Sequence, residues 1–237
     1  MVSLEEDHPS FEILPEQAYD YIDGSRLEGL ALEKVGLLYC GSLILRSSSP
    51  GNTIKSILGK TGLPLFVDLN LRPPWWTREK VDWCLSTSEW VKLNELELAE
   101  LTSKPTATTE ECTEAALGLA RAHRIDGLIV TRGSEGALAV LRGERVFETA
   151  AGQIGDFVDT VGAGDAFAAA FLHGLLSGQP APAAAERAFY QAFTDRDLTA
   201  MKAVWVDAPR AACVHPGSGL LLGTGIAYPV LIMIAVA

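Results

Sequence analysis

The middle of the chain alternates between short apolar runs and longer stretches whose apolar residues recur with a helical period. The apolar runs predict buried strands at residues 35–40, 64–70, 90–93 and 127–131. Helical spacing predicts helices at residues 53–59, 94–101, 109–123 and 164–176. Two further apolar segments flank Arg142-Gly143 and predict a hairpin. Strands separated by helices are joined by right-handed crossovers, so we expect an α/β fold with a mostly parallel sheet and helices on both faces.

Polar side chains stand at the carboxyl ends of three predicted strands. They are Asp68 and Asn70, Lys92 and Asn94, and Thr131 and Arg132. Ligands of parallel sheets bind beyond the carboxyl ends of the strands. The sequence therefore predicts one polar site at this edge of the sheet.

A glycine-containing turn, Asp159-Thr-Val-Gly-Ala-Gly-Asp165, precedes the last predicted helix. The backbone N–H groups of Gly162, Ala163 and Gly164 can converge at the N-terminus of this helix, which carries partial positive charge and favours an anion. A carboxylate beside such a site, here Asp165, suits proton removal from a hydroxyl that attacks a phosphoryl group. An ordinary helix N-terminus with a favourable Asp is the alternative reading of the same residues.

Composition and missing motifs exclude several classes of function. The net charge of −11, from 30 acidic and 19 basic residues, argues against a general nucleic-acid surface. The four cysteines form no Cys-x-x-Cys pair, which predicts reduced thiols and a cytoplasmic protein. The sequence contains neither a Gly-x-x-x-x-Gly-Lys-Ser/Thr loop nor a Gly-x-Ser-x-Gly elbow, so it fits neither a P-loop enzyme nor an esterase.

Four motifs, taken together, resemble those of the ribokinase-like (PfkB) carbohydrate kinases, and they occur in the order of that family. Asp68-Leu-Asn-Leu-Arg72 resembles its Asp-x-Asn-x-Arg strand end, and Asn94-Glu-Leu-Glu97 its Asn-x-x-Glu motif. Thr131 to Gly136 resembles its Thr-x-Gly-x-x-Gly segment, and Asp159 to Asp165 its C-terminal signature. The run at 66–76 is most similar to the fructokinase branch. The resemblance covers roughly residues 10–180 and implies a three-layer ribokinase-like sheet.

The resemblance also implies a role for each matching residue. Asp165 would be the general base on the sugar hydroxyl, and the N–H groups of Gly162, Ala163 and Gly164 would stabilise charge on the transferred phosphoryl group. Asn94 and Glu97 would hold Mg²⁺ through water. Nucleotide binding is implied for Thr131, Gly133, Gly136, Lys92 and Asn94. Contacts to the sugar or to phosphate are implied for Asn70, Arg72, Asp159 and Thr160.

The resemblance fades towards both ends of the chain. Met1 falls where a member of the family would already be well into its chain, so we expect an incomplete sheet that lacks most sugar-holding residues. Residues 189–223 instead resemble the opening of a SnoaL-like domain. We therefore expect a partial kinase domain at 1–185 and a short helix and strand stub at 186–237. The apolar tail of the stub reads as a buried strand or an out-of-context tail rather than a membrane anchor.

Two functions follow from these observations. The first is a fructokinase-like sugar kinase of the cytoplasm that uses ATP and Mg²⁺ and acts on a small-molecule sugar, with no nucleic-acid or membrane partner. The alternative is a catalytically inactive kinase-derived fragment or fusion with at most residual nucleotide binding. A sheet that lacks its first strands exposes an edge, which leaves a homodimer open. The sequence does not identify the sugar.

Overall fold

Within the described residues, the central sheet has nine strands, in the order β10-β9-β11-β3-β4-β5-β6-β7-β8. The computed structural model describes residues 2–5, 8–11, 13, 15–16, 18–22, 24, 35–150, 163–185, 211–213, 221–222 and 230–233. Four adjacent strands of the sheet are parallel: β3 (Leu37–Gly41), β4 (Leu65–Asp68), β5 (Trp90–Asn94) and β6 (Gly127–Thr131). An antiparallel hairpin, β7 (Ala137–Leu141) and β8 (Arg145–Thr149), extends the sheet beyond β6.

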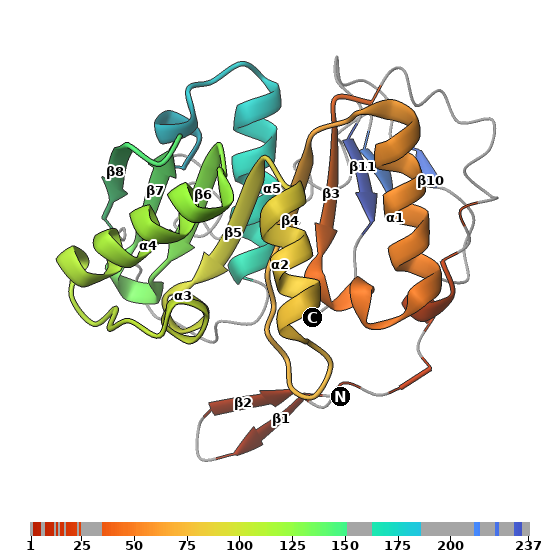
Figure 1. Cartoon of the computed structure of the whole chain (residues 1–237), viewed down its shortest axis with the longest axis horizontal. Coiled ribbons are helices and arrows are strands. Elements are labelled where there is room, and N and C mark those ends of the chain that lie inside the picture. The colour runs from red at the N-terminus through yellow and green to blue at the C-terminus, as the bar shows by residue number, and fades with distance from the viewer. Residues whose placement is uncertain are drawn as a thin grey trace.

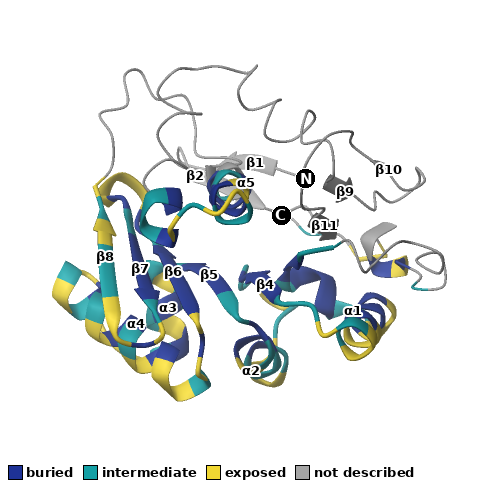
Figure 2. Ribbon diagram, turned by 90° about the horizontal axis from the view of Figure 1, so that it is seen from above, coloured by how far each residue is buried: buried dark blue, intermediate teal, exposed yellow. Residues whose placement is uncertain are grey.

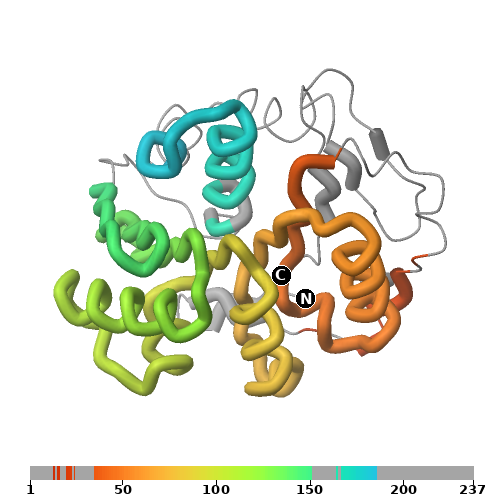
Figure 3. The backbone as a smooth tube through the Cα atoms, turned by 45° about the horizontal axis from the view of Figure 1, so that its top comes forward, coloured from red at the N-terminus to blue at the C-terminus, as the bar shows by residue number. Residues whose placement is uncertain are grey.

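Helices cover both faces of this sheet, as the sequence predicts. One face carries α1 (Ser48–Thr61), α2 (Arg78–Thr87), α3 (Glu95–Thr102) and α4 (Thr109–His123). The other face carries α5 (Ala163–Leu176), which Figures 2 and 3 show on the opposite side from the four other helices. Short 3₁₀ helices stand at η1 (Ala18–Tyr21), η4 (Ser42–Arg46) and η5 (Gly133–Glu135). The expected three-layer, mostly parallel α/β fold is confirmed.

Helix α2 is an α-helix that the apolar pattern does not predict. Only Val81, Cys84 and Leu85 of this helix are buried against the core, so its apolar stripe is short. The helix begins instead with a local signal, because the Thr77 side chain accepts a hydrogen bond from the Lys80 N–H. The predicted helix at 53–59 is longer in the structure, where α1 begins at Ser48.

The C-terminal tail contributes strands to the same sheet (Figure 1). Strand β11 (Val230–Met233) pairs in parallel with β3, with Val230 opposite Leu37 and Met233 opposite Cys40. Strands β9 (Ala211–Cys213) and β10 (Leu221–Leu222) follow outward. The β3 edge that we expected to be exposed is therefore covered by β11. The segment 189–210, most of the SnoaL-like resemblance, lies outside the described residues.

The remaining described segments add little to the site. Strands β1 (Val2–Glu5) and β2 (His8–Phe11) form a separate two-stranded sheet. Within the described ranges, no helix has the length and apolar character needed to cross a bilayer. Cys40, Cys84 and Cys112 are buried free thiols, and burial raises the pKa of all three, that of Cys84 to about 12. Such thiols are poor nucleophiles, so none of the three is a candidate for catalysis.

Candidate active site

A buried ion pair lies at the carboxyl ends of β4 and β5. Asp68 and Lys92 are opposite each other in the strand register. The Lys92 ammonium donates to both carboxylate oxygens of Asp68, at 2.8 Å each, and the two side chains are 7% and 2% exposed. The Tyr39 hydroxyl donates a further hydrogen bond of 3.2 Å to Asp68 Oδ2. Three neighbouring strands thus contribute to one polar cluster beneath α5.

The N-terminus of α5 lies directly against this cluster. A Cβ atom placed on Gly164 would stand 3.3 Å from the Lys92 Nζ atom, closer than most side-chain contacts. Because glycine has no side chain, the backbone of the first turn can approach the ammonium. The first N–H groups of an α-helix have no partner within the helix. A full positive charge and the positive end of α5 therefore meet at one place, which is the arrangement that a phosphate group needs.

Asn94 and Glu97 form a capping box at the start of α3. Asn94 Oδ1 accepts from the Glu97 N–H at 2.9 Å, and Glu97 Oε2 accepts from the Asn94 N–H at 2.9 Å. The second carboxylate oxygen of Glu97 accepts from the Leu71 N–H at 3.0 Å. Glu97 therefore joins the loop after β4 to the start of α3, a link between residues that are distant in sequence.

Burial raises the pKa of the Glu97 carboxyl above its ordinary value of 4.5. Its two backbone N–H donors and the Lys92 charge act in the opposite direction, and the Asp68 charge adds to the increase. Glu97 thus belongs to the same electrostatic cluster as the buried ion pair. Its capping role was predictable from Asn94-x-x-Glu97, but its bond to Leu71 was not.

The loop after β4 is held by hydrogen bonds to its backbone N–H and C=O groups. The Ser42 hydroxyl donates to the Asn70 carbonyl at 3.2 Å and accepts from the Asn70 N–H at 2.9 Å. The Arg72 N–H donates to the Asn70 carbonyl at 3.0 Å, which closes a tight turn. Asn70 and Arg72, both predicted site residues, are partly buried in this loop. The Leu71 contact holds the loop beside Glu97.

The segment for which the resemblance implies nucleotide binding follows β6. Thr131 is opposite Asn94 in the strand register, and its hydroxyl donates to the Leu93 carbonyl at 3.4 Å. Gly133 and Gly136 have φ values of +52° and +94°, which only glycine adopts readily. The structure therefore brings Thr131 next to the Asn94 cap. The backbone conformation of the turn accounts for the glycines at positions 133 and 136.

Arg132, predicted as a polar strand end, is occupied by structural contacts. Its guanidinium is 6% exposed and donates to Glu135 at 2.5 Å and to Thr109 at 2.9 Å. A further contact of 3.5 Å joins it to Glu95. These bonds fix η5 against α3 and α4.

Several predicted residues lie outside what the structure describes. Asp159, Thr160 and Gly162 are in the undescribed segment 151–162. Ala163 and Asp165 begin α5, but their side chains are not among those described. Of the predicted site, the structure thus places Lys92 with Gly164, and Asn94 with Glu97 and Thr131. Asp68, predicted as a polar strand end, is placed with Lys92. Tyr39 and Ser42 were not predicted as site residues: Tyr39 stands in an apolar run and reads as core.

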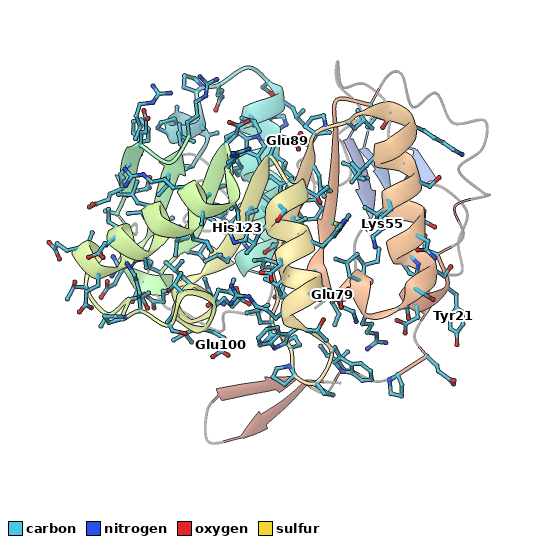
Figure 4. The ribbon with its side chains drawn as sticks, in the orientation of Figure 1. Tyr21, Lys55, Glu79, Glu89, Glu100 and His123 are labelled. Carbon is cyan, nitrogen blue, oxygen red and sulfur yellow. The ribbon has the colours of Figure 1, made fainter. Side chains whose placement is uncertain are left out.

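A pocket of about 470 Å³ lies elsewhere, between α1 and α2. Lys55 and Glu79 line it, and Figure 4 shows both between these helices. The Lys55 ammonium stands 5.3 Å from the centre of the Trp83 ring, so the charge is already engaged on the pocket wall. None of the predicted site residues lines this pocket.

Among the described residues, no group of three or more His, Cys, Asp or Glu side chains could hold a metal ion by itself. Mg²⁺ commonly keeps several waters and uses one or two carboxylates together with substrate phosphates. Each Glu97 oxygen accepts one backbone bond and retains a second lone pair. The donor set therefore fits a magnesium ion held through water and phosphate.

Comparison with known proteins gives consistent matches. A family model described as "pfkB family carbohydrate kinase" matches residues 17–193. The chain is 28% identical to a ribokinase of Arabidopsis thaliana over 144 residues, which is 59% of this chain and 36% of the relative. It is 34% identical to a fructokinase of Escherichia coli over 115 residues, or 46% of this chain and 35% of the relative. The matches thus span little more than a third of these curated relatives.

Solved structures share the fold at low identity. A sugar kinase of Pyrococcus horikoshii in complex with ATP superimposes with a TM-score of 0.65 at 23% identity, covering 81% of this chain and 62% of the other. A fructokinase of Vibrio cholerae, bound to fructose, ADP and potassium ion, gives a TM-score of 0.63 at 23% identity, covering 86% and 68%. These similarities show the architecture of the sheet and its helices.

Proposed function

Since this chain belongs to the pfkB family of carbohydrate kinases, we propose that it binds ATP and transfers the γ-phosphoryl group to a sugar hydroxyl, as a fructokinase does. The observation that carries the proposal is the Lys92 ammonium against Gly164 at the start of α5. A phosphoryl group is transferred mainly by positioning and electrostatic stabilisation, and both are available at this point. The solved relatives with this fold include one bound to ATP.

In this proposal the nucleotide phosphates lie over the start of α5. The N–H groups of Gly162, Ala163 and Gly164 and the Lys92 ammonium receive them. The turn after β6, with Thr131, Gly133 and Gly136, lines the rest of the nucleotide. Contacts to sugar or phosphate come from Asn70, Arg72, Asp159 and Thr160. Alanine substitution of Lys92, Asn70, Arg72, Asp159 or Thr160 tests the side-chain contacts.

Asp165 acts as the general base. Its carboxylate takes the proton of the attacking hydroxyl, whose oxygen forms a bond to the γ-phosphorus. The bond between that phosphorus and the bridging oxygen of the β-phosphate breaks, and ADP leaves with the electron pair. A magnesium ion, held through water by Asn94 and Glu97, would neutralise phosphate charge. Positioned bases of this kind contribute about 10²- to 10⁴-fold to a rate.

We further propose a division of the chain at residue 185. Residues 1–185 would supply the kinase portion, and residues 186–237 a stub whose β11 joins the kinase sheet. We expect the partner to be a small-molecule sugar and the compartment to be the cytoplasm. A homodimer is expected if a remaining edge of the sheet pairs between two copies of the chain. Size-exclusion chromatography with light scattering measures the last point directly.

A second candidate function follows from the length of the match. Because the match covers only 35–37% of each curated relative, the chain is also compatible with a kinase-derived fragment that binds nucleotide without turnover. In such a fragment the start of α5 still binds phosphate, but Asp165 has no fixed hydroxyl to deprotonate. The two candidates differ in whether a sugar stimulates ADP release.

The test measures ADP release by the purified chain with MgATP and a panel of ketoses, aldoses and nucleosides. Asp165→Ala is the matched blank, and circular dichroism establishes that both proteins are folded. Sugar-dependent release that falls about 100-fold or more in Asp165→Ala supports the kinase. ATP binding by calorimetry with equal background release in both proteins supports the fragment. Absence of ATP binding by the folded chain contradicts both.

A further inference from the structure

A charged pair interrupts an otherwise apolar sheet face. Beneath α5, one row of the sheet runs through Tyr39, Phe66 and Trp90, which are adjacent in the strand register. These rings pack against α5, with Phe171 at 6.1 Å from Phe66 and 5.5 Å from Trp90, measured between ring centres. The next row toward the carboxyl edge contains Asp68 and Lys92 instead. Figure 2 shows α5 above these strands.

A buried ion pair adds little to the stability of a fold. Desolvation of two charges offsets most of their mutual attraction, and replacing a buried ion pair by apolar residues of similar volume is often neutral or stabilising. An aliphatic pair would also continue the apolar packing under α5. The pair therefore has a use other than holding the sheet and the helix together.

The geometry directs the Lys92 ammonium at the α5 turn. An ammonium has three N–H donors, and two of the Lys92 donors go to the two oxygens of Asp68. The same Nζ atom faces the bare Cα of Gly164. Asp68 is itself held by the Tyr39 hydroxyl, so the carboxylate that fixes the ammonium has a fixed position of its own. A lysine stem is flexible, and without such a partner its charge would occupy many positions.

We infer that Asp68 is a positioning residue for phosphate binding: it holds the Lys92 ammonium at the N-terminus of α5, where that ammonium binds a nucleotide phosphate. This inference rests on the proposed function. Tyr39 supports Asp68 in the same role. Binding then loses little side-chain entropy, since the lysine is already ordered before the phosphate arrives. Asp68 contacts no phosphate itself and acts through Lys92.

The sign of the effect of Asp68→Asn separates this role from simple neutralisation. If Asp68 only cancels the Lys92 charge, its removal leaves the ammonium charge uncompensated, and phosphate binds more tightly. If Asp68 positions the ammonium, its removal weakens phosphate binding. Calorimetry with ATP and with inorganic tripolyphosphate gives both dissociation constants. We expect Asp68→Asn to weaken both by about tenfold, and unchanged or tighter binding would overturn the inference.

If Asp68→Asn does not fold, a double variant tests whether the Lys92 ammonium binds phosphate, and Tyr39→Phe tests whether the position of that ammonium depends on Asp68. In Asp68→Leu/Lys92→Met both charges are replaced by apolar groups, so we expect a melting temperature equal to or above that of the wild type. We expect the same variant to bind both probes at least tenfold more weakly. Retained affinity overturns the inference. Tyr39→Phe removes only the support of Asp68 and should weaken binding by about two- to fivefold, whereas no change contradicts the role of Tyr39.

A control variant separates a loss of stability from a loss of binding, and the wild type separates this inference from the proposed function. Leu85→Ala destabilises the opposite face of the sheet without changing any charge, and it should leave the affinity of the folded protein unchanged. A weaker affinity in Leu85→Ala would show that any loss of stability lowers binding, which overturns the inference. If the wild type binds neither probe, the proposed function itself fails. If the wild type binds and the charge variants bind equally well, only the role of Asp68 fails.

Discussion

The two faces of the sheet bury different kinds of side chain. On the face covered by α1 to α4, the residues of the four parallel strands β3 to β6 are apolar along the strand, as in Leu65 and Val67 of β4 and Val91 and Leu93 of β5. On the face covered by α5, the same strands begin with aromatic rings and end with Asp68 and Lys92. Both faces exclude water, but within β4 and β5 only the α5 face carries buried charged side chains.

This difference separates stability from binding. A continuous apolar face needs only volume and shape, and it responds to cavities. A face that ends in a buried ion pair is sensitive to the loss of one partner, because the other charge is then unpaired. On the α5 face, the aromatic half of the strands therefore packs against α5. The other half, at the carboxyl edge of the sheet, carries the ion pair.

The largest expected effect comes from breaking the buried pair. Asp68→Asn leaves the Lys92 ammonium buried without its counter-charge, and we expect it to lower the free energy of unfolding by about 3–5 kcal/mol. Urea unfolding monitored by circular dichroism measures this loss. Asp82→Asn is the matched control, because the ion pair of Asp82 with Arg78 is 45% and 57% exposed. That control should change stability by about 0.5 kcal/mol or less. Equal losses in the two variants would show that burial does not distinguish the pairs.

The purely apolar face gives the second effect. Leu98 of α3 is fully buried and Leu96 of the same helix is 75% exposed. Leu98→Ala should lower the free energy of unfolding by about 2–5 kcal/mol through lost burial and the cavity that remains. Leu96→Ala, the same chemical change on the exposed side, should stay within about 0.5 kcal/mol. A large loss in Leu96→Ala would mean that this side of α3 is covered in solution.

In the aromatic half of the α5 face, we expect a smaller loss of stability, caused by added volume instead of a cavity. A Cβ atom on Gly127 would lie 2.2 Å from two carbon atoms of the Trp90 ring. Gly127→Ala must therefore displace that ring from its place beside Phe171, and we expect a loss of about 1–3 kcal/mol. Gly118 of α4 has no atom within 4 Å of its Cβ position. Gly118→Ala should instead stabilise the helix by about 0.5–1 kcal/mol. Thermal unfolding of both variants shows whether the signs differ.

Much of this architecture could be predicted from the sequence, because periodicity and capping are local. The helix at 109–123 has the predicted bounds, and the helix predicted at 94–101 is α3, with Asn94 as its N-cap. The neighbours of a side chain across the sheet are not local. Nothing in the sequence links Tyr39 to Asp68, Glu97 to the Leu71 N–H, or the tail strand β11 to β3. The motifs therefore indicate which residues matter, and the fold decides which of them touch.

The smallest expected effect concerns Glu97 at the start of α3, whose pKa responds to both charges of the pair. Because burial raises the pKa of Glu97 in the folded state, folding favours its protonated form. Its contribution to stability is fully present below the unfolded pKa of 4.5 and is lost as pH rises through the raised folded pKa. In Glu97→Gln the side chain at this position does not titrate. The contributions of all other titrating groups cancel when the free energies of unfolding of the two proteins are subtracted.

The free energy of unfolding of the wild type, minus that of Glu97→Gln, should therefore fall as pH rises from 4 toward 7. Urea unfolding of both proteins across this range measures the difference. A constant offset is expected as well, because the glutamine side chain has only one oxygen for the two N–H donors of Leu71 and Asn94. A difference that rises with pH would mean that those two donors and the Lys92 charge outweigh burial. The Glu97 carboxylate at the start of α3 would then be stabilised by its hydrogen bonds and by the Lys92 charge. The polar edge of the sheet would in that case add to the stability of the fold at neutral pH.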